Sequence, residues 1–162
     1  MRGFSRGGNR SDSSAAAKGH VHVISAGNSG SLYREMQKHM VPTPVGFFVN
    51  EMASPFSIIV GASDDGSQEP TSANPHTVAK LASPFAGAMF GADGVDRPIT
   101  LNGTTRLDRG SSYASPQVSA KIINLLEEQP ELTNEKVVAH LKAEARPVTG
   151  GDDFLGFGIL TS

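Results

Sequence analysis

The segment GSSYASP, at residues 110–116, is the most informative stretch of this chain. Apolar residues follow it at the spacing of one helix face, at Val118, Ile122, Leu125 and Leu126. This pattern predicts a buried helix with Ser111 or Ser112 as N-cap and with Pro116 within or just beyond the first turn. A serine at the positive end of a helix faces unpaired backbone N–H groups, which can stabilise an oxyanion. Ser112 is therefore a candidate nucleophile, although serines at helix starts are far more often plain caps.

The composition is typical of one loop-rich globular domain. Hydrophobic residues make up 38% of the 162 residues and charged residues 19%, while 18 glycines and 10 prolines indicate many turns. The formal net charge is -2 and the charges are spread along the chain, so we expect no nucleic-acid partner. The absence of cysteine excludes disulfides and thiolate metal sites. Apolar runs are too short to cross a membrane as a helix, and residues 1–18 have no export-signal core, so the compartment stays unassigned.

The chain divides into a short lead-in and one domain. Residues 1–14 are polar and rich in glycine and serine, and we expect them to be a flexible lead-in to a domain over residues 15–162. Residues 15–18 are predicted to form a short helix that Gly19 stops. Prolines interrupt residues 66–98, where we expect loops with one short strand near 78–82.

Two segments indicate strands of a parallel sheet. Residues 20–25 are rich in β-branched side chains and lead into the glycine-rich loop 26–30. Residues 57–62 form a nearly unbroken apolar run, which predicts a strand that is buried on both faces. The expected fold class is therefore α/β.

The C-terminal part carries three further local signals. Asn102 and Gly103 separate two β-type runs within residues 99–107 and predict a tight hairpin. Thr133 is predicted to cap a helix that ends at Arg146-Pro147, with Glu135 in its first turn and one apolar face formed by Val137, Leu141 and Ala145. Residues 156–160 are predicted to form a short closing strand.

The loop SAGNSG, at residues 25–30, follows the first predicted strand at the end where open α/β sheets place binding residues. Asn28 could donate its amide to an oxyanion, and Gly27 would let a substrate pass close to the strand end. The alternative is an ordinary turn, in which Asn and Gly tolerate left-handed backbone. A phosphate-binding loop is disfavoured because no Lys follows Gly30 and the glycine spacing fits no nucleotide motif.

Taken together, these segments resemble the subtilisin-like serine peptidases, the subtilases. GSSYASP is similar to that family's G-T-S-M-A-S-P nucleophile box, with Ser111 for Thr and Tyr113 for Met. HVISAGN, at residues 22–28, is similar to the strand and loop that carry the family's oxyanion-hole asparagine, and IVGA, at residues 59–62, is similar to the strand that follows. The order and separations of the segments agree from about residue 15 to the C-terminus.

The resemblance implies a fold and a set of roles. It implies a three-layer subtilisin-like fold with a parallel sheet, and peptide or protein substrates. Ser112 would be the nucleophile, and the Asn28 side chain and the Ser112 backbone N–H would bind the oxyanion. Ser25, Ala26 and Gly27 would line one wall of the substrate side-chain pocket. A calcium ion is suggested by the resemblance alone, and no cofactor can be identified.

Two departures from the family pattern are visible. Gln117 stands where the family usually has His after the proline, a histidine that is not catalytic. Residues 69–87 depart more, because SPFAG, at residues 83–87, is only loosely similar to the family's A-P-G turn.

The catalytic aspartate and histidine of the family have no counterpart here. Both precede the A-G-N strand in subtilases, and neither motif is present in this sequence. The five histidines are His20, His22, His39, His76 and His140. His76 lies in a predicted loop and is the one substitute base considered. Asp64, Asp65, Asp152 and Asp153 lie in turn-like sequence, where acidic residues are usually solvated, and they form no spaced calcium loop.

This absence predicts a sheet that is truncated at its N-terminal half and has an open edge. Three interpretations follow: a fragment of a serine endopeptidase without its Asp and His, a catalytically inactive peptide-binding or interaction module, or one part of a split enzyme. In the last case a second chain would supply the missing sheet half and the base. An unrelated α/β binding domain is a more distant alternative.

Overall fold

The computed structural model describes residues 19–28, 57–63, 88–147 and 156–161. Within these residues, a four-stranded sheet has the strand order β1-β2-β3-β6 and every neighbouring pair is parallel. The strands of this sheet are β1 (His22–Ser25), β2 (Ser57–Ser63), β3 (Ala88–Asp93) and β6 (Ile159–Leu160). The remaining elements are β4 (Arg97–Leu101), β5 (Thr104–Asp108), α4 (Ser111–Glu128) and α5 (Asn134–Glu144). The predicted α/β class with a parallel sheet is confirmed.

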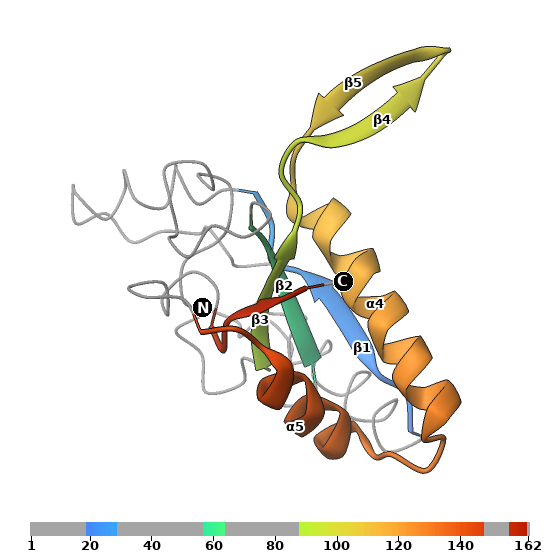
Figure 1. Ribbon diagram of the computed structural model, residues 1–162, viewed down its shortest axis with the longest axis vertical. Coiled ribbons are helices and arrows are strands. Elements are labelled where there is room, and N and C mark those ends of the chain that lie inside the picture. Colours follow the sequence, from blue (N-terminus) through green and yellow to red (C-terminus); the bar gives the residue numbers. More distant parts are fainter. Residues whose placement is uncertain (1–18, 29–56, 64–87, 148–155, 162) are drawn as a thin grey trace, which may run out of the picture.

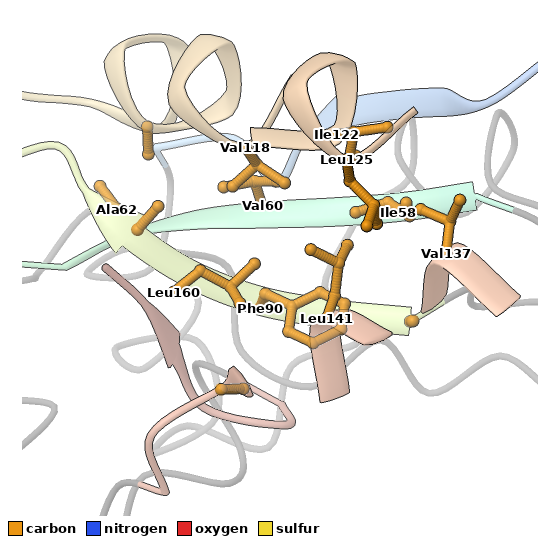
Figure 2. Close-up of a cluster of buried hydrophobic side chains, with 14 residues drawn as sticks. Ile58, Val60, Ala62, Phe90, Val118, Ile122, Leu125, Val137, Leu141 and Leu160 are labelled. Carbon is orange, nitrogen blue, oxygen red and sulfur yellow. The ribbon is translucent and has the colours of Figure 1, made fainter. Parts of the chain in front are cut away.

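The core lies between the sheet and the two helices. Side chains from alternate positions of β2 and β3 meet the buried faces of α4 and α5, as Figure 2 shows for Val60 and Phe90 of the sheet and Val118 and Leu141 of the helices. Ile59, from the opposite face of β2, is also fully buried. Burial on both faces explains the unbroken apolar run of this strand. One helical layer and the sheet are thus described, and any third layer lies outside the described residues.

β3 corrects the expectation of loops between residues 66 and 98. Its sequence, AMFGAD, has two alanines and a glycine and therefore weak β propensity, but the strand pairs with β2 along its whole length. Phe90 is fully buried and packs against α4 and α5, so tertiary burial overrides local preference. The short strand expected near 78–82 and the turn at 83–87 lie outside the described residues, as do the short helix 15–18 and the lead-in.

The hairpin β4–β5 confirms the turn prediction. Asn102 and Gly103 have φ of 51° and 77°, so both central residues of the turn are left-handed, as a type I′ turn requires. Pro98, which was expected to break regular structure, lies within β4 opposite Leu107. A two-stranded ribbon tolerates it because one edge of each strand needs no partner. Figure 1 shows the ribbon projecting away from the parallel sheet, just before the start of α4.

Helix α5 and the closing strand also follow the sequence pattern. Thr133 caps α5 by accepting a hydrogen bond from the Lys136 N–H, and Val137 and Leu141 are fully buried. The helix ends at Glu144, just before the predicted stop. β6 is limited to Ile159–Leu160 and is thus shorter than predicted. No helix in the described parts of the chain has the length and apolarity needed to cross a membrane.

Candidate active site

The start of α4 differs from the sequence prediction. The N-cap is Gly110, and no side chain of the cap residue bonds to the helix, so neither Ser111 nor Ser112 is the cap. The missing acceptor comes from another element: the Ser111 N–H donates to Oδ1 of Asn28 at 2.9 Å. An amide oxygen from the loop after β1 thus satisfies one of the unpaired donors of this helix end. Pro116 lies in the second turn of α4 and cannot donate to the carbonyl of Ser112.

The Ser111 hydroxyl joins this contact from inside the protein. Ser111 is 1% exposed, and its Oγ donates to Oδ1 of Asn28 at 3.1 Å while it accepts the Gly27 N–H at 3.1 Å. The oxygen of the Asn28 amide therefore receives two hydrogen bonds from one residue. Since oxygen and nitrogen of an amide are distinguished by such partners, these bonds orient the Nδ2 group away from Ser111.

Asn28 Nδ2 and Ser112 Oγ border the same small space above Gly110. A Cβ placed on Gly110 would lie 3.0 Å from the Nδ2 of Asn28 and 3.4 Å from the Oγ of Ser112. Gly110 also has a φ of 155°, which side chains rarely adopt, so glycine keeps this space open. Ser112 itself is exposed, and its N–H has no acceptor among the described residues. A nucleophile and two candidate oxyanion donors therefore surround one point.

Backbone hydrogen bonds attach this helix start to the sheet. The Gly110 N–H donates to the Gly94 carbonyl at 2.8 Å, and the Gly94 N–H donates to the Ser63 carbonyl at 2.9 Å. A Cβ on Gly94 would lie 2.7 Å from the Ala62 Cβ and 2.8 Å from the Gly110 carbonyl oxygen. Gly94 is therefore required for the close approach of α4 to the ends of β2 and β3.

The three predicted pocket-wall residues differ in accessibility. Ser25 and Gly27 are half-buried, whereas Ala26 is fully buried and its N–H donates to the Val60 carbonyl at 2.8 Å. The Ser25 hydroxyl lies 2.8 Å from the Ser115 hydroxyl and links β1 to α4. The exposed surface of this wall is thus formed by Ser25 and Gly27.

Polar contacts also connect the hairpin to the helix start. The Tyr113 hydroxyl donates to Oδ2 of Asp108 at 3.1 Å, and the Arg109 N–H donates to Oδ1 of the same carboxylate at 2.9 Å. The Arg109 hydrogen bond and that from Tyr113 lower the pKa of Asp108. Desolvation and the adjacent Asp108 carboxylate raise the pKa of Tyr113. Gln117, which replaces the family histidine, donates to the carbonyls of Asp93 and Tyr113.

No histidine adjoins Ser112 among the residues that the structure describes. His20 and His22 lie at the amino end of β1, whereas Ser111, the neighbour of Ser112, bonds to Gly27 and Asn28 after its carboxyl end. His140 lies on α5 and pairs with Glu144 at 3.1 Å. The other two histidines and the four turn aspartates named above lie outside the described residues. No group of three or more metal-binding side chains occurs within the described ranges.

An apolar groove lies between the first strand of the described sheet and α4. Its volume is about 530 Å³, and its lining includes Val21, Val23, Ile122, Ile123 and Leu126. Ile123 is 57% exposed there.

Comparison with known proteins places the chain in a family. The sequence matches the subtilase family over residues 3–158. The chain belongs to the subtilase family. No match was found among curated protein sequences.

Solved structures of subtilisin-like proteases share the fold of this subtilase chain. It is similar to Sphericase, with a TM-score of 0.65 and 23% identity over 98% of this chain and 53% of that one. A psychrophilic protease gives a TM-score of 0.63 with 20% identity, over 99% and 54% of the two chains. The prenylagaramide maturation protease PagA gives 0.58 with 22% identity, over 93% and 51%. The chain thus spans about half the length of these structures.

The roles of four residues of this site were not predicted from the sequence. Ser111 was predicted only as a possible cap, although its burial and its bonds to Gly27 and Asn28 make it the residue that orients the amide. The role of Gly94 was not predicted, because its neighbours come from strands distant in sequence. The bond between Asp108 and Tyr113 was not predicted either, although a tyrosine five residues after an acid was a visible signal.

Proposed function

We propose that this chain is the C-terminal part of a subtilisin-like serine endopeptidase, in which Ser112 attacks the carbonyl carbon of a peptide bond. The Ser112 Oγ bonds to that carbon, its proton passes to a base, and the carbonyl oxygen becomes an oxyanion. The base then protonates the leaving amine as the carbon–nitrogen bond breaks. Water hydrolyses the resulting acyl-enzyme and restores the serine.

The observation that carries this proposal is the orientation of Asn28. Both hydrogen bonds from Ser111 end on Oδ1, at 2.9 and 3.1 Å, and so direct Nδ2 toward the side of Ser112. Preorganised donors of this kind are the main source of transition-state stabilisation in acyl transfer. If Asn28 served only to cap α4, its Oδ1 would be enough, and an exposed Ser112 beside its Nδ2 would have no purpose.

The base and its orienting carboxylate are proposed to come from polypeptide outside the described residues, either elsewhere in the same protein or in a second chain. One observation supports this part of the proposal: the chain spans about half of its structural neighbours. Hydrolysis would therefore depend on assembly of the two halves.

The alternative is a non-catalytic module that binds peptides through the same strand ends. This alternative is favoured by the lack of a described base and by the use of Asn28 as the acceptor for the start of α4. The two proposals differ in whether Ser112 reacts with acylating or phosphonylating reagents.

The test is reaction of the purified chain with a fluorophosphonate, followed by peptide mass spectrometry. We expect the label on Ser112, no label in S112A and unchanged labelling in S119A, which removes a hydroxyl from the same helix. Ser119 donates to the Ser115 carbonyl and also lines the groove beside β1, so S119A controls for the loss of a helix hydroxyl in the isolated chain. A folded chain that leaves Ser112 unlabelled would show that this chain alone is not a peptidase and would favour the binding module.

A further inference from the structure

Tyr113, which stands at the methionine position of the nucleophile box, makes a contact that the catalytic proposal does not use. Its hydroxyl donates to Oδ2 of Asp108 at 3.1 Å, although the two residues belong to different elements, the end of β5 and the first turn of α4. Ser112 lies directly before Tyr113. Any force that holds the Tyr113 ring therefore acts on the backbone that carries Ser112.

The same turn is closed by two further hydrogen bonds. The Arg109 N–H donates to Oδ1 of Asp108 at 2.9 Å, and the Tyr113 N–H donates to the Gly110 carbonyl at 3.0 Å. Both carboxylate oxygens of Asp108 thus accept a hydrogen bond: Oδ1 from the Arg109 N–H and Oδ2 from the Tyr113 hydroxyl. The bonded ring spans residues 108–113 and encloses Gly110, which has a φ of 155°.

We propose that the Tyr113 phenol and the Asp108 carboxylate form a latch that fixes residues 110–113, and with them Ser112, to the base of the β4–β5 hairpin. Tyr113 and Asp108 are positioning residues in this proposal, because neither provides the attacking oxygen or the oxyanion donors. The effect on Ser112 reactivity rests on the proposed peptidase function, whereas the latch itself does not.

Among the described residues, two arginines lie near the Asp108 carboxylate or the turn that follows it. Arg106 lies with Nη2 3.6 Å from Oδ2 of Asp108, and Arg109 lies with Nη2 4.0 Å from Oδ1 of Asp96. Both arginines are about half-exposed or more, so water screens their contribution. The hydrogen bond to an ionised acceptor is the stronger contact, because charge-assisted bonds exceed neutral ones. The distance between the Tyr113 hydroxyl and the Asp108 carboxylate and the raised pKa of Tyr113 are both consistent with a hydrogen bond between these two side chains.

The composition allows the latch to be observed directly. The chain has no tryptophan and two tyrosines, Tyr33 and Tyr113. In a Y33F background, the ultraviolet absorbance of tyrosinate reports Tyr113 alone. We expect Tyr113 to ionise above the ordinary tyrosine pKa, near 10, and D108N to lower its pKa toward that value. Identical titrations of Tyr113 with and without D108N would overturn the latch.

The positioning effect is measured by amide hydrogen exchange of residues 110–113. Y113F keeps the ring and loses the donor, so we expect the bonded amides of Gly110, Ser111 and Tyr113 to exchange about three- to tenfold faster, which corresponds to the usual net value of one hydrogen bond. D108E keeps a carboxylate and should restore part of the protection that D108N removes. Equal exchange in Y113F and the parent would show that the latch does not fix the turn.

A third measurement separates this proposal from the peptidase proposal. Fluorophosphonate labelling of Ser112 should be slower in Y113F, and the difference should shrink in acid as Asp108 becomes protonated in the parent. Equal labelling rates at neutral pH would contradict the effect on Ser112. If the parent takes up no label at all, peptidase activity of this chain alone is excluded, while titration and exchange still determine whether the latch exists.

Discussion

Replacing Ser111 by alanine removes the hydroxyl that connects β1, the A-G-N loop and α4. The Ser111 side chain is 1% exposed, and S111A leaves the Gly27 N–H without its acceptor at 3.1 Å. Oδ1 of Asn28 keeps the Ser111 N–H at 2.9 Å but loses the hydroxyl donor. An unsatisfied, partly buried backbone donor costs about 1–3 kcal/mol, so we expect the free energy of unfolding to fall by that amount.

Urea unfolding measures this loss. With a slope of about 1–3 kcal/mol per molar urea for a small domain, the midpoint should fall by roughly 1 M. S119A is the matched control, because its hydroxyl also bonds one backbone group of α4, and it should change stability by no more than about 0.5 kcal/mol. The reasoning is refuted if S111A and S119A unfold at the same urea concentration.

Three further perturbations follow from the packing and charges. G94A places a Cβ 2.7 Å from the Ala62 Cβ and should lower the free energy of unfolding in urea by about 1–3 kcal/mol. G103A is the comparison, because a Cβ at the open hairpin tip meets no neighbour and the cost comes only from placing alanine in a left-handed backbone conformation. The pKa of Glu144 is lowered, chiefly by the Lys121 hydrogen bond. The ionised Glu144 carboxylate therefore contributes to folding stability above pH 4.5, and this contribution is lost as the pH falls through the pKa of the folded state. E144Q should therefore lower the free energy of unfolding at pH 7 by no more than about 0.5 kcal/mol, since the Glu144 side chain is 40% exposed. In acid the stabilities of E144Q and the parent should become equal, and a difference that grows in acid would contradict this prediction. I123K replaces a side chain that is 57% exposed and should change stability in urea unfolding by no more than about 0.5 kcal/mol; a larger loss would contradict this exposure.

The sequence predicted best the elements with strong local signals. Asn102 and Gly103 fix the hairpin because both must be left-handed, and Thr133 with Val137 and Leu141 identifies α5 by its cap and buried face. These signals act over a few residues, so they survive without knowledge of the tertiary structure. Segment order also identified the family and the parallel sheet.

The features that could not be predicted depend on distant partners. β3 is a strand because Phe90 is buried between β2 and the helices, which its own residues do not reveal. Helix α4 begins at Ser111 with Gly110 as its N-cap because Asn28, 83 residues before Ser111, supplies the acceptor that a local cap would provide. The same long-range bond gives Asn28 its orientation, so the sequence could name the residue but not the geometry.

The central claim is that Asn28 and Ser112 form one oxyanion-binding nucleophile site. The most direct measurement compares fluorophosphonate labelling of Ser112 in the parent and in N28D. Asp keeps the oxygen that accepts the Ser111 bonds and replaces the Nδ2 donor by a second oxygen, so the fold should be retained. The account predicts labelling about 10²- to 10³-fold slower in N28D, the usual effect of losing one oxyanion donor. Equal labelling of folded parent and N28D would contradict the account.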